Sequence, residues 1–285
     1  MGPEGGLLRS HPDQGRGAGR LGAAGDRAGQ LGGEKRVMTA ILELRKLSVT
    51  FGSVPAVQEL DLSVPEGRIM TIIGPNGAGK TTVLNLISGL VRPTGGSVVF
   101  RGEDVTGFSP HHLSRKGIGR SFQQNNVFFS LSVRENVRLA AQAHGRDNWK
   151  FYRRARSFPI YEEAAGQALG KVNLVEEADQ PASSLSQGGL RRLELAILLA
   201  TSPVLLLMDE PLAGVADGDV PFLTDIIRRL RKEGQTIIWV EHKMDQVLAL
   251  SDEILVMDHG QAVALGPPAV IAGDERVQMA YLGRN

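Results

Sequence analysis

The sequence predicts an α/β protein in which helices cover a mainly parallel sheet. Three observations support this fold class. From Ile41 onwards, short apolar stretches typical of strands alternate with helical patterns. A glycine-rich turn lies between one such strand and the helix that follows it, as in proteins that bind ligands at the edge of a parallel sheet. A long segment at about residues 130–183 has helical spacing and few strand signals, which indicates a helical insert.

The expected elements follow one another in a regular order. Strand patterns occupy residues 41–51, 60–64, 68–73, 98–101, 204–208, 236–240 and 253–257. Helical patterns outside the insert occupy residues 80–90, 110–116, 186–200 and 221–233. This alternation of strand and helix implies a parallel sheet covered by helices.

Residues 1–38 differ in composition from the rest of the chain. They consist mostly of Gly, Arg, Ala and Gln and contain few large apolar residues. Such a segment cannot offset its ordering entropy by burial, so we expect it to be disordered. An alternative is that Met38 is the true first residue. We expect one folded domain at residues 39–285, with a helical subdomain at about residues 128–188.

Composition excludes several classes of protein. The chain has 285 residues, a formal net charge of +1 and no cysteine, which excludes disulfides and cysteine-ligated metals. The near-zero net charge gives no support for general nucleic-acid binding. No apolar run approaches the roughly 20 residues that a membrane-spanning helix needs. The N-terminal segment also lacks the apolar core of a secretory signal.

The strongest functional signal is a complete phosphate-binding pattern, G-x-x-x-x-G-K-[ST], at residues 74–81. Its glycines let backbone N–H groups turn inward around phosphate oxygens, and the following helix adds the positive end of its dipole. Lys80 supplies a charge for the β- and γ-phosphates, and the Thr81 hydroxyl is a ligand for Mg²⁺. A chance glycine-rich turn is the alternative. The predicted nucleotide-binding residues here are Gly74, Asn76, Gly77, Gly79, Lys80, Thr81 and Thr82.

A second signal is a pair of carboxylates at the end of the apolar strand at 204–208. Ligands bind at the carboxyl ends of strands in open α/β sheets. Asp209 would hold Mg²⁺ through water, and Glu210 would polarise the water that attacks the γ-phosphate. An acidic pair after a strand is by itself often only a strand end, but the phosphate-binding pattern in the same chain favours the catalytic interpretation.

The segment before the helix at 190–200 reads Leu185-Ser186-Gln187-Gly188-Gly189. It resembles the signature motif of ABC transporter ATPases, which is usually read L-S-x-G followed by a polar residue. The resemblance implies that Ser186 and Gly188 contact ATP bound to a partner subunit. A simple helix N-cap would also explain the pentapeptide in isolation. Its place shortly before the strand that ends in Asp209 makes the resemblance specific.

Three further residues fit the same family in the expected order. Gln123 resembles the glutamine that senses the γ-phosphate and binds Mg²⁺, with Gln124 as an adjacent alternative. His242 resembles the switch histidine that contacts the γ-phosphate. Phe51 resembles the aromatic residue that stacks on adenine, although a core aromatic is the alternative. The resemblance thus implies Glu210, His242 and Gln123 as catalytic residues, and Thr81, Gln123 and Asp209 as metal ligands.

The resemblance covers about residues 41–282 and implies a P-loop NTPase fold with a parallel-sheet core, an antiparallel β subdomain and a helical insert. Within the family, the chain looks like the ATPase subunits of importers of branched-chain or related amino acids or small polar solutes. The sequence segments that resemble those of such subunits lie at residues 117–123, 131–137, 240–244 and 280–283. Related exporters of lipid-like cargo share several of them.

The resemblance also implies cofactors, partners and a location. The cofactors are ATP and Mg²⁺. The partners are transmembrane permease subunits, for which the helical insert carries a docking groove, and a second ATPase subunit that is identical or paralogous. No nucleic acid is expected, and the implied location is peripheral, at the cytoplasmic face of the inner or plasma membrane.

The sequence departs from the family pattern at two places. The signature has Gln187, Gly189 and Leu190, where relatives usually carry other residues, and Ala216 replaces a common Asp or Asn. We therefore expect weaker coupling between two ATP sites, with hydrolysis retained. The alternatives are a regulatory module that pairs with an active ATPase paralogue, a soluble ABC-type mechanoenzyme and, least supported, a kinase for a small substrate.

Overall fold

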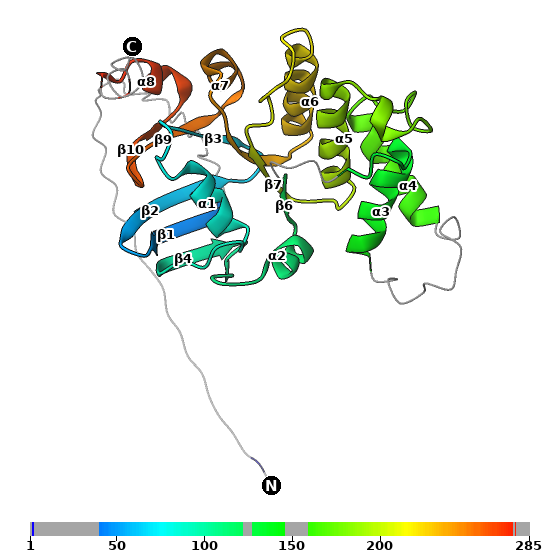
Figure 1. Ribbon diagram of the computed structural model, residues 1–285. Coiled ribbons are helices and arrows are strands. Elements are labelled where there is room, and N and C mark those ends of the chain that lie inside the picture. The colour runs from blue at the N-terminus through cyan, green and yellow to red at the C-terminus, as the bar shows by residue number, and fades with distance from the viewer. Residues whose placement is uncertain (1, 3–39, 122–126, 146–158, 276, 278–285) are drawn as a thin grey trace, which may run out of the picture. The chain divides into compact units, whose positions relative to one another are not determined.

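A six-stranded sheet forms the centre of the protein (Figure 1). The computed structural model describes residues 2, 40–121, 127–145, 159–275 and 277, so the expected tail (apart from Gly2), Gln123 and Gln124 lie outside the described residues. The strand order is β10-β9-β3-β8-β7-β6. The pairs from β9 to β6 are parallel, and β10 is antiparallel to β9. The strands are β3 (Ile69–Ile73), β6 (Ile118–Arg120), β7 (Leu205–Asp209), β8 (Thr236–Val240), β9 (Glu253–Asp258) and β10 (Gln261–Gly266).

The three central strands of this sheet are buried on both faces. Every residue of β3, β7 and β8 is buried, which explains their continuous apolar sequences. The other sheet is antiparallel, with order β2-β1-β4-β5, and β1 and β2 alternate between buried and exposed residues. Its strands are β1 (Ala40–Phe51), β2 (Val54–Pro65), β4 (Gly95–Phe100) and β5 (Glu103–Asp104).

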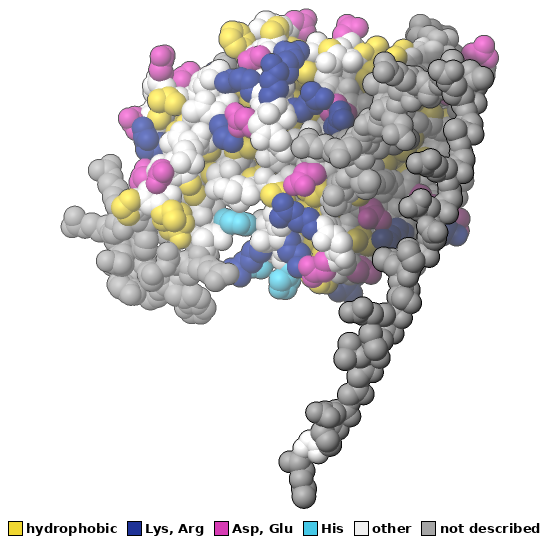
Figure 2. All heavy atoms as spheres, turned by 180° about the vertical axis from the view of Figure 1, so that it is seen from behind, with side chains coloured by type: hydrophobic (Ala, Val, Ile, Leu, Met, Phe, Trp, Pro, Cys, Tyr) yellow, Lys and Arg dark blue, Asp and Glu magenta, His cyan; other side chains and the backbone are white. Residues whose placement is uncertain are grey.

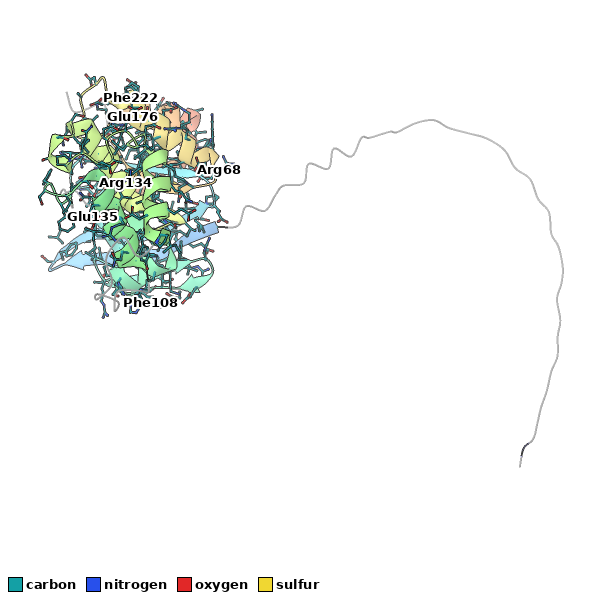
Figure 3. All side chains as sticks on the ribbon, turned by 90° about the vertical axis from the view of Figure 1, so that its right-hand side faces the viewer. Arg68, Phe108, Arg134, Glu135, Glu176 and Phe222 are labelled. Carbon is teal, nitrogen blue, oxygen red and sulfur yellow. The ribbon has the colours of Figure 1, made fainter. Side chains whose placement is uncertain are left out.

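Helices cover the six-stranded sheet, and α3 and α4, which lie in the expected helical insert, pack against each other and against α5. One hydrophobic core joins α1 to both sheets, and another joins the insert and α6 to the opposite face of the parallel sheet. The helices are α1 (Lys80–Ile87), α2 (Pro110–Lys116), α3 (Val133–His144), α4 (Pro159–Lys171), α5 (Gln187–Leu199), α6 (Val220–Lys232), α7 (Met244–Leu250) and α8 (Pro268–Ala272). In Figure 3 the side of the molecule that carries α3 faces the viewer, and the labelled Arg134 and Glu135 of α3 are drawn below Phe222 of α6 and above Phe108.

The fold class is confirmed, and the differences from the sequence-based elements are local. The helix expected at residues 80–90 ends at Ile87, because Gly89 has a φ of 73° and lies so close to the Phe108 carbonyl that a side chain there would overlap it. The expected strand at 60–64 is part of the longer β2. β5, β6, β10, α7 and α8 were not expected. β5 and β6 have only two and three residues and α8 has five, too few to give a periodic signal.

The surface of the folded unit carries mixed charges. On the face seen in Figure 2, basic and acidic side chains are interspersed among apolar and polar ones. Within the described part of the chain, no helix is both long enough and apolar enough to span a bilayer.

Candidate functional site

The loop between β3 and α1 has a backbone that glycine makes possible. Gly74, Gly77 and Gly79 have positive φ angles of 155°, 83° and 96°. A Cβ atom at Gly74 would overlap the Met257 carbonyl oxygen, and one at Gly79 would overlap that of Ala56. The loop therefore packs closely against two neighbouring segments while Asn76 and Gly77 remain exposed. It ends at the N-terminus of α1, where backbone N–H groups and the helix dipole favour an anion.

Lys80 is the first residue of α1, and its side chain reaches back over this loop. Its ammonium donates hydrogen bonds to the carbonyl oxygens of Gly74 (2.7 Å) and Pro75 (2.9 Å). Burial lowers the pKa of Lys80, and the nearby carboxylates of Glu210 and Asp209 oppose this effect. The loop therefore contains a buried cation next to backbone donors, an arrangement that suits phosphate oxygens.

Asp209 ends β7 and faces the start of α1. The Thr81 hydroxyl donates a 3.4 Å hydrogen bond to its Oδ1, while the buried Oδ2 has no hydrogen-bond partner. Burial raises the pKa of Asp209; the Thr81 hydrogen bond and the charges of Arg120 and Lys80 oppose this effect. Oxygen donors with one unsatisfied buried atom fit Mg²⁺. Among the described residues no three His, Cys, Asp or Glu side chains cluster as a metal site, so the remaining ligands would come from phosphate and water.

The structure brings Glu210 and His242 together. Their elements, the ends of β7 and β8, are neighbours in the sheet, and His242 Nε2 lies 2.9 Å from Glu210 Oε1. Glu210 has a φ of 50°, and its N–H donates a 2.9 Å hydrogen bond to the Val240 carbonyl. A left-handed conformation costs a non-glycine residue about 1–3 kcal/mol and is often associated with function. Both side chains remain more than a third exposed, so a ligand can reach them.

Two positioning residues escaped the sequence interpretation. The buried Glu241 accepts hydrogen bonds from the N–H groups of His242 (2.9 Å) and Lys243 (3.3 Å), and from that of Leu212 (3.4 Å). It therefore ties the loop that carries His242 to the segment after Glu210. Arg120 lies at the other side of the site, 3.8 Å from Asp209. A charged residue directly after a buried strand was the available signal for Glu241.

Ser186 and Gly188 lie at the start of α5 and not in the loop before α1. The Ser186 hydroxyl caps α5 by accepting a 3.1 Å hydrogen bond from the Gly189 N–H. Gly188 packs so closely against Asp219 that a Cβ atom would overlap its carboxylate. Within the described residues, no hydrogen bond or ion pair joins Ser186 or Gly188 to Lys80 or Asp209. The arrangement is compatible with contacts to a nucleotide on another subunit and gives Gly188 an additional role within its own chain.

The two remaining expected residues are Thr82 and Phe51. Thr82 is half-buried in the first turn of α1. Phe51 ends β1 with 52% of its surface exposed, so it is not a core aromatic. Its hairpin partner strand, β2, runs past the loop at Ala56. The exposed ring of Phe51 is available for stacking on a base.

The close contact of Gly188 leads to a stability prediction. Gly188→Ala is expected to lower the free energy of unfolding by about 1–3 kcal/mol, because the added methyl group overlaps Asp219. Thermal unfolding of the nucleotide-free chain measures this loss. In an Asp219→Gly background, which removes every side-chain atom of Asp219 that the methyl group would meet, most of the loss should disappear. Gly166→Ala in α4, where a Cβ atom has open space, serves as the matched control. An unchanged melting temperature for Gly188→Ala would contradict the overlap.

A cavity of 420 Å³ lies beside the site, between the parallel sheet and the helical insert. α2, β6, α3 and α5 contribute its walls, which are mainly apolar. Its basic residues are His111, Arg115, Arg120 and His144. Burial and the nearby charges of Arg115 and His111 lower the pKa of His144. The lowered pKa favours the neutral form of His144, and Glu194 also lines the cavity, so its surface is mainly apolar with a few charged side chains of both signs.

The comparisons agree with this geometry. The family model described as ABC transporter matches residues 57–213. The chain is 38% identical over 251 residues to the high-affinity branched-chain amino acid transport ATP-binding protein BraF of Pseudomonas aeruginosa, covering 85% of this chain and 98% of that protein. It is 36% identical over 252 residues to LivG of Escherichia coli, with the same coverage and an equivalent description. The ADP conformation of an ATP-binding cassette of an ABC transporter has 30% identity and a TM-score of 0.77, covering 86% of this chain and 100% of that structure.

Proposed function

Since the chain belongs to the ABC transporter family and is an ATP-binding and ATP-hydrolysing subunit, we propose that it powers an importer of branched-chain amino acids. The observation that carries the cargo class is the similarity to BraF and LivG over nearly their whole length. Residues 39–285 would form the ATPase domain, with a helical subdomain at about residues 128–188, and residues 1–38 would be a tail outside it.

The geometry supports a division of roles during hydrolysis. Lys80 and the backbone of the 74–79 loop bind the β- and γ-phosphates, and Phe51 stacks on the adenine. Asp209 and Thr81, with Gln123, hold Mg²⁺, which when bound offsets phosphate charge. Glu210 orients and polarises the attacking water. His242 hydrogen-bonds to Glu210 and keeps its carboxylate near the γ-phosphate position. Phosphoryl transfer needs mainly such positioning and charge stabilisation.

Two ATPase subunits would complete each site. Ser186 and Gly188 do not meet Lys80 within one chain, so we assign them to ATP held by a second subunit. Ser186 is the exposed N-cap of α5, and a helix N-terminus suits a phosphate. The partner is a second copy or a paralogue. Because Gln187, Gly189 and Ala216 depart from the family pattern, assembly should be tested both with a second copy of the chain and with a paralogue.

Transport also needs membrane permease subunits. The 420 Å³ cavity has the position and apolar walls to receive a segment of a permease between the parallel sheet and the helical insert. Movement of the insert relative to Asp209 and Glu210 would then be transmitted to the permease. The chain would lie at the cytoplasmic face of the inner or plasma membrane, bound through these partners.

Measurements of amino acid uptake by cells that naturally produce the chain test this function. Deletion of its gene is expected to abolish most of the uptake of radiolabelled leucine, isoleucine and valine, because transport loses its energy source. The wild-type gene should restore uptake, and a gene carrying Lys80→Met should not. Uptake of labelled glucose serves as the control. Unchanged uptake of all three amino acids in the deletion strain would refute the proposed cargo.

A further inference from the structure

Arg120 connects the candidate metal ligand to two neighbouring elements. It is the last residue of the edge strand β6 and pairs in register with Leu207 of β7, which brings its side chain beside Asp209. Its Nη1 donates a 2.7 Å hydrogen bond to the hydroxyl of Ser88, the C-cap of α1, and its Nη2 lies 3.8 Å from Asp209 Oδ2. Only 9% of the Arg120 side chain and 1% of the Asp209 side chain are exposed.

The two charges attract each other without a hydrogen bond. Arg120 Nε and Asp209 Oδ2 are buried, and neither has a hydrogen-bond partner. The 3.8 Å separation exceeds the roughly 2.7–2.9 Å of a charge-assisted hydrogen bond. A buried carboxylate without a nearby cation is costly, so Arg120 and Lys80 together offset the charge of Asp209. The guanidinium is therefore held in place by its hydrogen bond to Ser88 and not by one to Asp209.

Arg120 also has space to move. Besides contacting Ser88 and lying near Asp209, it lines the 420 Å³ cavity between the parallel sheet and the helical insert. A guanidinium that turns towards this cavity moves away from Asp209 and can be hydrated there. The same residue thus borders both the candidate metal site and the cavity.

We propose that Arg120 is a built-in counter-ion that competes with the metal ion for the charge of Asp209 and thereby sets the affinity of the site for metal. The inference rests on the proposed magnesium site at Thr81 and Asp209. Without metal, the guanidinium offsets the buried carboxylate. A bound divalent cation replaces it in this role, and repulsion between the two cations moves Arg120 towards the cavity. Arg120 is a positioning residue, and it eases release of metal together with ADP.

Arg120→Met separates this role from a purely structural one. The melting temperature of the ligand-free variant is expected to fall, because Asp209 loses a counter-ion. Adding Mg²⁺ to the ADP-saturated protein should raise the melting temperature of Arg120→Met by more than it raises that of the wild type. At saturating ADP, the dissociation constant for Mg²⁺ should fall on the order of tenfold, because a competing charge has been removed. Arg120→Lys should restore much of both properties.

The controls distinguish the possible outcomes. Arg138→Met removes another buried arginine, which pairs with Glu135 on α3, and should lower stability without changing the Mg²⁺ affinity. In an Asp209→Asn background, Arg120→Met should cost little stability. If Arg120→Met weakens or does not alter Mg²⁺ binding, the counter-ion role is overturned. If Arg120→Met does not fold, Arg120→Gln, which keeps a donor for Ser88, decides in its place. If wild-type ADP binding is independent of Mg²⁺, the proposed metal site itself fails.

Discussion

Glu210→Gln is expected to reduce MgATP turnover of the purified chain by about 10²–10⁴-fold while nucleotide binding persists. Glutamine has nearly the same shape, tolerates the same backbone conformation and can still hydrogen-bond to His242. It lacks the negative charge that polarises the attacking water. Lys80, Thr81 and Asp209 remain, so the affinity for ATP should change little. Phosphate release measures turnover, and a fluorescent ATP analogue measures affinity.

The same variant reports on assembly. With ATP present and hydrolysis blocked, a pair of chains should accumulate, which light scattering after size-exclusion chromatography detects as a doubled mass. Glu176→Gln, an exposed position on the helical insert, makes the same charge change and should retain wild-type turnover. Undiminished turnover in Glu210→Gln would exclude Glu210 as the catalytic carboxylate. Binding without turnover in the wild type would indicate that the chain needs a paralogous partner, and Gln187, Gly189 and Ala216 would be the substitutions to revert first.

The conformation of the loop at residues 74–79 could be predicted from sequence because it depends on a short local segment. Gly74 and Gly79 are required by positive φ angles and close backbone contacts, and Lys80 follows them directly at the start of a helix. The spatial neighbours of this loop were less predictable. Strand order places β8 between β3 and β7, and this order brings His242 next to Glu210. Nothing in the local sequence encodes that order. The resemblance to a family implied that both residues are catalytic, and the contact between them came from the structure.

Arg120 shows where sequence interpretation stops. Its strand has three residues and no periodicity of its own, and its importance comes from a register with β7 that only the folded sheet defines. Gly188 shows a different limit. Its place in a signature motif suggested contact with a nucleotide, whereas the structure adds a contact with Asp219 in the same chain. A single glycine can satisfy both requirements, and measurements on the nucleotide-free chain are needed to separate them.

Lys80→Met is expected to lower the affinity for ATP by about 10²–10³-fold, because the ammonium is the buried charge directly beside the phosphate loop. Methionine keeps much of the apolar stem, so the fold should be retained. Burial lowers the pKa of Lys80. Phosphate binding requires the charged form, so wild-type affinity should fall as the pH rises through this lowered pKa, and the affinity of Lys80→Met should lack that dependence.

Calorimetric titration with ADP at several pH values tests both parts of this expectation. Lys232→Met removes an exposed lysine from the last turn of α6 and should leave affinity and its pH dependence unchanged. An alkaline loss of affinity that persists in Lys80→Met would assign the titration to another group. Affinity equal to that of the wild type would mean that the backbone N–H groups and the α1 dipole bind the phosphates without the lysine. The phosphate-loop lysine would then serve mainly to offset Asp209 and Glu210, the carboxylates that oppose the effect of burial on its pKa.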